Sequence, residues 1–193
     1  MRQWFLVFLS LAVVGCNGGG SSNSSTNSSN APVQVTPSTG IFLDSPVAGL
    51  SYQSTSQSGT TNSQGEFLYL PGETVSFRLG SIALGTASGA STVTPLDLVG
   101  ANSLDEAKLL NLEEELTNRL LLLQSLDADG NPDNGIDVTR FSPETVSADL
   151  NFSQPVEVFV DGPYRKLVNE SGGQYVDPKS ATNHFLASTN QSI

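Results

Sequence analysis

The chain has 193 residues and a formal net charge of −11, with a single cysteine and an abundance of Gly, Ser, Asn and Thr. This length allows one domain, or one domain in two unequal lobes. The 19 acidic residues outnumber eight Lys and Arg residues, which argues against nucleic acid and anionic headgroups as partners, because phosphates require a basic surface. Such acidity fits either simple solubility or cation binding. One cysteine cannot form an internal disulfide, and the composition is typical of a loop-rich extracytoplasmic β protein.

Residues 1–15 have the pattern of a secretory signal peptide. Met1–Gln3 carries one positive charge, and Trp4–Val14 is almost wholly apolar but, at about a dozen residues, too short to span a bilayer. The apolar run ends in Val-Val-Gly-Cys, which resembles the lipobox of bacterial lipoproteins. The resemblance implies diacylglyceryl modification of Cys16, cleavage after Gly15 and acylation of the new amino terminus, an anchor of three acyl chains. The alternative is an ordinary signal peptide with an accidental cysteine.

Residues 16–39 are predicted to be the lipidated cysteine and a disordered tether. Asn17–Asn30 is a low-complexity Gly/Ser/Asn run that cannot bury a core. A flexible tether of about 20 residues has a root-mean-square reach of roughly 25 Å. Asn17 follows the cysteine at the position where Asp is the usual inner-membrane retention signal, which favours sorting to the outer membrane. We therefore expect a lipid-anchored domain in the outer membrane, facing either the periplasm or the exterior.

Residues 40–100 have the pattern of several short strands separated by turn signals. Val75–Leu79 alternates apolar and polar residues with period two, which predicts a half-buried strand. The spacing of about ten residues between strands predicts a small antiparallel β-sandwich. The other strand candidates are Ile41–Leu43, Gly49–Gln53, Phe67–Leu70 and Ser81–Leu84.

Three short motifs in this region occur in a recognisable order. They are Pro-Val-Ala-Gly-Leu from Pro46, Thr-Asn-Ser-Gln-Gly-Glu-Phe from Thr61 and Leu-Pro-Gly-Glu-Thr-Val from Leu70. Over residues 41–84 this order resembles the carboxypeptidase-regulatory-like, or prealbumin-like, β module. The resemblance implies a non-catalytic scaffold with no active site to transfer to this chain.

Residues 101–193 are predicted to be a helical lobe. Ser103 and Glu106 form a capping-box pattern, and leucines at three- and four-residue intervals predict one helix from about Leu104 to Ser125. The helix is apolar all round over Leu120–Leu123, so we expect its last turns to be buried.

An acidic loop follows this helix. Side-chain oxygens at alternate positions can converge on Ca²⁺, which takes six to eight oxygen ligands. The candidate ligands are Asp127, Asp129, Asn131, Asp133 and Asp137. The loop departs from an EF-hand at Pro132 and Val138, and Asp127–Asp133 resembles a thrombospondin-type calcium loop instead. The alternative is a polar turn, with Gly130 at positive φ and Asn134-Gly135 reversing the chain.

The chain as a whole carries a further resemblance. The segments from Asp44, Thr94 and Leu122 together resemble a group of uncharacterised surface lipoproteins of Gram-negative bacteria. In that group a β module precedes a helix that ends in Leu-Asp-x-Asp-Gly-x-Pro-x-Asn-Gly-Ile. This resemblance implies architecture and location, and no activity.

The C-terminal third offers weaker signals. Ser142–Glu144 predicts a turn or short helix, and Val156–Val160 predicts a strand. Asp177 before Pro178 predicts a helix N-terminus, with the helix over Lys179–Ala187. His184 is the only histidine, no partner set for zinc accompanies it, and no nucleophile motif stands near it in the sequence, so we interpret it as structural.

Together these patterns predict an α+β protein, with a small antiparallel β-sandwich, a long helix and a short α/β C-terminal segment. The first hypothesis is a membrane-anchored, non-enzymatic lipoprotein whose domain binds or scaffolds an envelope protein or glycan. The second is an adhesion module stiffened by calcium. The third is an envelope hydrolase that uses carboxylates, although no carboxylate pair is singled out by the sequence.

Overall fold

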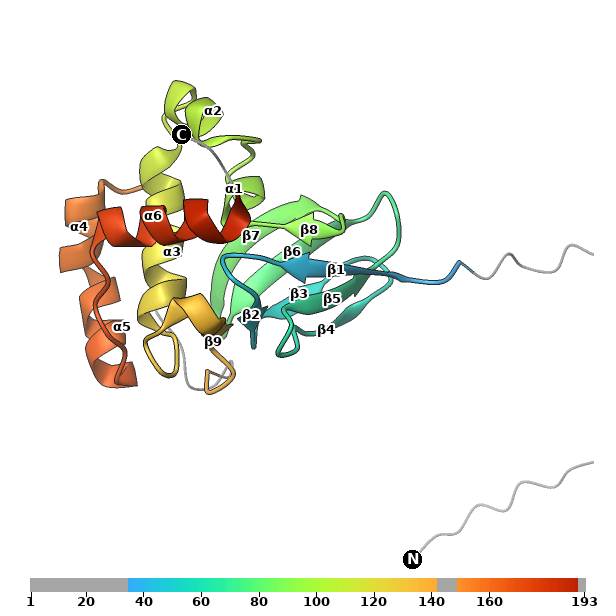
Figure 1. The fold of residues 1–193 in the computed structure, drawn as a ribbon, viewed down its shortest axis with the longest axis horizontal. Helices are drawn as coiled ribbons and strands as arrows, with labels where there is room; N and C mark the ends of the chain where they lie inside the picture. The colour runs from blue at the N-terminus through green and yellow to red at the C-terminus, as the bar shows by residue number, and fades with distance from the viewer. Residues whose placement is uncertain (1–34, 142–148, 191–193) are drawn as a thin grey trace, which may run out of the picture. The chain divides into compact units, whose positions relative to one another are not determined.

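The computed structural model describes residues 35–141 and 149–190. The predicted signal peptide, Cys16 and most of the tether therefore lie outside the described residues, as does the predicted turn at Ser142–Glu144. The described residues form an α+β structure in which small sheets come first and helices follow (Figure 1). This order confirms the predicted class.

Nine strands in the described part of the chain form three sheets. The three-stranded sheet has the order β5 (Glu66–Tyr69), β1 (Ser38–Phe42), β8 (Thr92–Val93); the four-stranded sheet β4 (Ser58–Thr60), β3 (Ser51–Gln53), β6 (Thr74–Leu79), β7 (Ile82–Ser88); and the third β2 (Val47–Ala48), β9 (Ile136–Asp137). The β1–β8 and β2–β9 pairs are parallel, and the other pairs are antiparallel. The predicted antiparallel pairing therefore holds for the four-stranded sheet and for β1 with β5, and two parallel pairs depart from it because later segments return to the edges of early strands.

Aromatic side chains join the two larger sheets. The Phe77 ring on β6 lies 4.8 Å from that of Phe42 on β1 and 5.1 Å from that of Phe67 on β5, between ring centroids. All three residues are buried. The period-two prediction for β6 is confirmed, since Val75, Phe77 and Leu79 are fully buried and the residues between them are more exposed.

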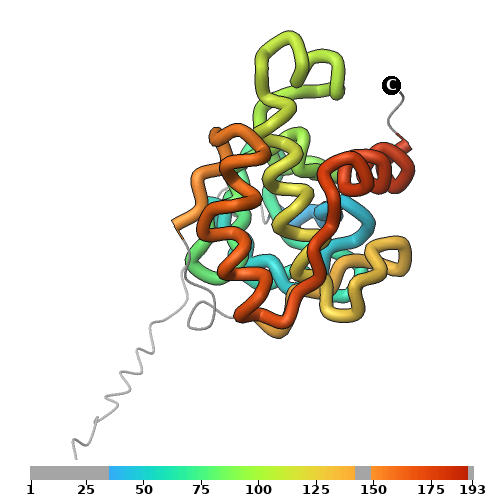
Figure 2. The backbone as a smooth tube through the Cα atoms, turned by 90° about the vertical axis from the view of Figure 1, so that its left-hand side faces the viewer, coloured from blue at the N-terminus to red at the C-terminus, as the bar shows by residue number. Residues whose placement is uncertain are grey.

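The helices follow the sheets in the chain. They are α1 (Pro95–Leu98), α2 (Leu104–Leu109), α3 (Glu113–Ser125), the 3₁₀ turn η1 (Pro132–Asn134), α4 (Val156–Asp161), α5 (Pro163–Ser171) and α6 (Pro178–Thr189). Figure 2 shows α3 with α4 and α5 on one side and α6 on the other. The helix α3 is thus the central element of this part of the molecule.

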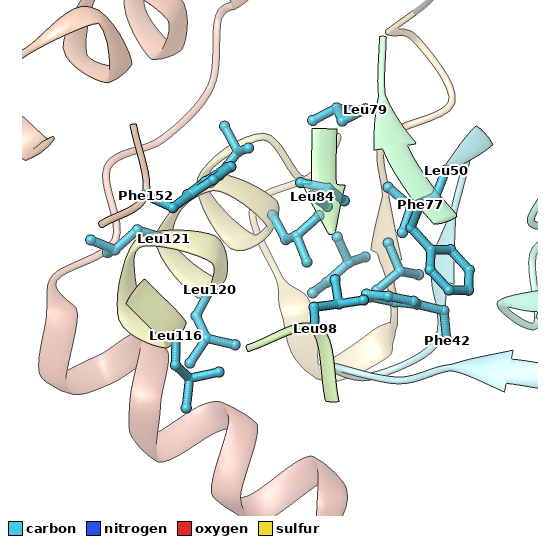
Figure 3. Packing of buried hydrophobic residues seen from close by; sticks show 14 of the residues in the cluster. Phe42, Leu50, Phe77, Leu79, Leu84, Leu98, Leu116, Leu120, Leu121 and Phe152 are labelled. Carbon is cyan, nitrogen blue, oxygen red and sulfur yellow. The ribbon is translucent and has the colours of Figure 1, made fainter. Parts of the chain in front are cut away.

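Burial of α3 follows from its sequence. Leu120–Leu123 is almost fully buried, as predicted. In Figure 3, Leu84 and Leu98 lie between the leucines of α3 and the phenylalanines of the sheets, so one apolar core is continuous from helix to sheet. Polar groups fix the same contact: Arg119 Nε donates to the Leu84 carbonyl at 2.6 Å.

The predicted continuous helix over residues 104–125 is wrong, because α2 and α3 are separate. Asn111 has a φ of 57°, a left-handed conformation that Asn tolerates better than most residues. The chain changes direction there, and Leu109, which the periodicity placed on the apolar face, is 83% exposed. The Ser103 cap is present, whereas the Glu106 carboxylate accepts from Asn102 instead of completing the capping box.

The predicted strand Val156–Val160 is also wrong, because these residues lie in the helix α4. A pattern of five residues does not distinguish a strand from a short helix. In α4 the buried residue is Phe159. That ring packs between Phe152 at 5.7 Å and Tyr164 at 5.0 Å, measured between centroids. The C-terminal segment among the described residues is therefore helical and not α/β. The N-cap at Asp177 is confirmed, and α6 extends further than predicted, to Thr189.

Candidate functional site

The acidic loop leaves α3 at Asp127, which is buried. The Asp127 Oδ1 atom accepts a hydrogen bond from the Asp137 backbone N–H at 2.8 Å, so this carboxylate ties the end of α3 to β9. The Oδ2 atom is also buried but accepts no hydrogen bond from the residues that the structure describes. A buried oxygen in this state costs free energy unless a further group compensates it.

Asp129 lies beside Asp127 but faces solvent. Its Oδ1 accepts from the Asn131 N–H and its Oδ2 from Asn134 Nδ2, both at 2.9 Å. Burial raises the pKa of Asp127, and the adjacent Asp129 carboxyl raises it further. The hydrogen bond from Asn134 lowers the pKa of Asp129. The two carboxyls therefore interact directly, and the inner one resists ionisation.

The remaining predicted ligands have other partners or orientations. Asp137 Oδ1 accepts from the N–H and hydroxyl of Thr139, at 2.8 and 2.6 Å, and Asp133 contacts His184. Among the described residues, no group of three or more His, Cys, Asp or Glu side chains is gathered so that it could hold a metal ion. The expected turn is present, since Gly130 and Gly135 both have positive φ.

A cavity of about 330 Å³ opens beside this loop. Three of the five predicted ligands line it, namely Asp127, Asp129 and Asp137. Asn134 and Ser63 line it as well, and the sequence pattern predicted neither. Ser63 comes from the turn before β5, so only the folded chain brings it here.

A second buried carboxylate lies in the turn between β1 and β2. Asp44 is fully buried, and Gln124 Nε2 on α3 donates to both of its oxygens, at 3.2 and 3.1 Å. The same amide nitrogen donates to the Ala181 carbonyl on α6 at 3.0 Å. Burial raises the pKa of Asp44 to about 7, although the Gln124 hydrogen bond opposes the rise. Three segments of the chain therefore meet at one group that titrates near neutral pH.

His184 on α6 connects this carboxylate to the surface. Its Nε2 lies 3.1 Å from Ser45 Oγ and 4.0 Å from Asp44 Oδ1, and its Nδ1 lies 3.1 Å from Asp133 Oδ1. The direction of each hydrogen bond depends on the imidazole tautomer. Side-chain exposure falls inward from 86% at Asp133 to 10% at His184 and to zero at Asp44. His184 thus links an exposed acid to a buried one.

Ser45, His184 and Asp133 stand in the order of a nucleophile, a base and an orienting acid. Ser45 also has a φ of 55°, a conformation that is uncommon for a residue other than glycine. The sequence did not predict this set, because 139 residues separate Ser45 from His184 and no local motif marks either. The hydroxyl-bearing residue is only 7% exposed, and the acid lies in solvent instead of being buried.

An open groove of about 440 Å³ lies on another side of α6. Its apolar lining comes from Leu104 on α2, Val156 on α4 and Leu186 on α6. Lysine and glutamate residues of α2, α3 and α6 also line it, so both signs of charge border the apolar floor. Leu109 and Leu110, at the end of α2, are 83% and 52% exposed.

In comparisons with protein families, curated proteins and solved structures, this chain has no match. No helix in the described ranges is long and apolar enough to cross a membrane. The resemblances drawn from sequence motifs therefore stay predictions.

Proposed function

We propose that this protein is a lipid-anchored lipoprotein of the outer membrane whose folded part is a non-catalytic binding module. In this proposal the two larger sheets act as a small β-sandwich scaffold, and the helices present the binding surface. The observation that carries the proposal is the open groove formed by α2, α3, α4 and α6, with an apolar floor and a charged border. Such a floor with a few polar groups around it is the common form of a ligand-binding surface.

The composition of the groove favours a protein partner over a glycan. Among the described residues no aromatic side chain lines the groove, so this lining offers no flat ring on which a sugar would stack. Leu109, the last residue of α2, and Leu110, which follows it, are exposed. Leu104 and Lys108 of the same helix line the groove. Covering Leu109 and Leu110 on a partner would contribute about 2–4 kcal/mol. We therefore propose an envelope protein that inserts apolar side chains into the groove.

The groove can be tested in intact cells with a photo-crosslinking amino acid. We expect a specific envelope protein to be captured from Asn183, an exposed groove residue, and not from Glu157, an exposed residue of α4 outside the groove. Leu109→Asp should reduce capture from Asn183 without changing the melting temperature, because the leucine is exposed. Equal capture from both positions, or no capture from either, would contradict the proposed surface.

The anchor is tested separately. Cys16→Ala should abolish incorporation of labelled fatty acid and release the protein from the membrane fraction, while leaving the groove unchanged. Membrane fractionation on a density gradient then distinguishes outer from inner membrane. Unchanged lipid labelling in the Cys16→Ala variant would contradict the lipobox.

A second candidate function is ester or amide hydrolysis through Ser45. The supporting observation is the pair of 3.1 Å contacts that connect Ser45, His184 and Asp133. Its test is labelling of the full chain with a fluorophosphonate probe, with Ser45→Ala as the control. Labelling that Ser45→Ala abolishes would establish the enzyme; the binding module predicts no labelling of Ser45, because that residue is 7% exposed.

A further inference from the structure

The acidic cavity takes no part in the groove or in the His184 contacts, and it contains an uncompensated group. Asp127 is 2% exposed and lines the cavity, and its Oδ2 has no hydrogen-bond partner. The other oxygen of the same carboxylate is already used by the Asp137 N–H. The Oδ2 atom of Asp127 is therefore buried and accepts no hydrogen bond from the described residues.

A second acidic side chain, Asp129, lines the same cavity as Asp127. Among the described residues, no Lys, Arg or His lines the cavity, so no basic side chain of its lining offsets these acids. A cavity lined by charges of one sign attracts counter-ions, which here are cations.

We propose that this cavity binds a divalent, oxygen-preferring cation of the Ca²⁺ type, with Asp127 and Asp129 as its carboxylate ligands. Asn134 and Ser63, which also line the cavity, supply further side-chain oxygens, and water completes the shell. The proposal does not depend on the groove or its partner. It also differs from the ligand set read from the sequence, because Asn131 and Asp133 do not line the cavity.

The donor chemistry selects the type of cation. The lining contains no His or Cys, which zinc and other transition metals prefer. Calcium accepts an irregular shell of six to eight oxygens and tolerates water, whereas Mg²⁺ demands near-octahedral geometry. With two carboxylates rather than a tight group of three or more, we expect weak affinity, with a Kd on the order of 10⁻⁴–10⁻³ M, as in extracellular calcium modules.

The position of the cavity gives the cation a structural role. Asp127 is at the end of α3 and accepts a hydrogen bond from the Asp137 N–H in β9, and Ser63 is in the turn before β5. The strand β9 pairs with β2, so these ligands belong to segments that connect the helical part to the sheets. A bound cation would cross-link these segments and stabilise the folded state by mass action.

The experiment uses the full chain in detergent at pH 8. At Ca²⁺ about tenfold above Kd, the ratio of folded to unfolded protein should rise about tenfold, which corresponds to a rise in Tm of roughly 3–6 °C relative to EDTA. Mg²⁺ at the same concentration should give a smaller rise. Calorimetric titration with Ca²⁺ then measures Kd directly.

Two matched variants decide which ligand set is correct. Asp129→Asn removes an exposed cavity carboxylate and should weaken Ca²⁺ binding by at least tenfold. Asp133→Asn removes another exposed carboxylate from the same loop but outside the cavity, and it should leave the Ca²⁺ affinity unchanged. Equal melting temperatures in Ca²⁺ and EDTA would overturn the proposal, and so would an equal loss of affinity in both variants.

Discussion

The two buried aspartates of this protein are held in opposite ways. Asp44 receives two contacts from Gln124 and has His184 within 4.0 Å, so its environment is supplied by the protein itself. Asp127 receives one backbone hydrogen bond, and its second oxygen has no partner. The comparison teaches that burial alone does not define a site. A carboxylate whose two oxygens both accept from the protein joins segments of the fold, whereas Asp127 keeps one oxygen that accepts from no described residue.

The strongest test of the Asp44 cluster is the pH dependence of stability. The pKa of Asp44 rises from 3.8 in its ordinary state to about 7 in the fold, so the folded protein binds the proton more tightly than the unfolded chain. The stability that this proton contributes is fully present below about pH 4 and is lost as the pH rises through about 7. By linkage the loss amounts to about 4 kcal/mol.

Urea unfolding of the wild type and of Asp44→Asn, each from pH 4 to pH 8, gives the free energy of unfolding as a function of pH. The difference between the two curves measures the loss of stability caused by Asp44. The variant should lack the decline and become the more stable of the two above pH 7, because its amide cannot ionise. Parallel profiles would show that Asp44 ionises in the fold as it does in water.

Removal of the donor should have the next largest effect. Gln124→Met keeps the volume approximately but deletes the amide that contacts Asp44 and the Ala181 carbonyl. Leaving a buried carboxylate and a carbonyl unpaired should cost about 3 kcal/mol at pH 7. The measurement is the free energy of unfolding in urea. The double variant with Asp44→Leu should recover part of the loss, and a fully additive loss would contradict the pairing of the two residues.

The opposite result is expected at the other aspartate. Asp127→Asn retains an oxygen for the Asp137 N–H and replaces the unpartnered oxygen with an amide that can donate to Asp129. Because burial raises the pKa of Asp127, its charge opposes folding, and the variant should be more stable than wild type in EDTA at pH 8. Thermal unfolding measures this change. A destabilised variant would show that the carboxylate is already compensated in the fold.

The smallest effect is expected at the surface end of the His184 contacts. The Asp133 side chain is 86% exposed, so its pairing with His184 is screened by water. Asp133→Asn should change the free energy of unfolding by less than about 0.5 kcal/mol. A loss of several kcal/mol would show that Asp133, rather than Asp44, holds α6 in place.

Local sequence signals predicted much of the fold for definite reasons. The N-cap Asp177 with Pro178 starts α6, because a side-chain oxygen and a fixed φ act within one turn. The strand β6 follows from its period of two. The prediction failed at Asn111 and at Val156–Val160, because a single left-handed residue and a five-residue pattern are each compatible with more than one path of the chain.

The candidate sites also contain some residues that local sequence signals predict and others that depend on tertiary contacts. Alternation of acidic residues after α3 identified Asp127 and Asp129, since both belong to one loop. It did not select among the remaining loop residues, because which side chains face the cavity depends on β9 pairing with β2 and on the approach of Ser63. The Asp44–Gln124 contact spans 80 residues and has no local signature.

By itself the sequence determined the α+β order, the burial of Leu120–Leu123 and the acidic character of the loop, because each depends on neighbours within a few residues. Only the tertiary structure decided that His184 meets Ser45 and that one oxygen of Asp127 stays unpartnered. The physical reason is that polar contacts between distant segments depend on where the apolar core packs those segments. A lone histidine or aspartate carries no periodicity that reveals its eventual partner.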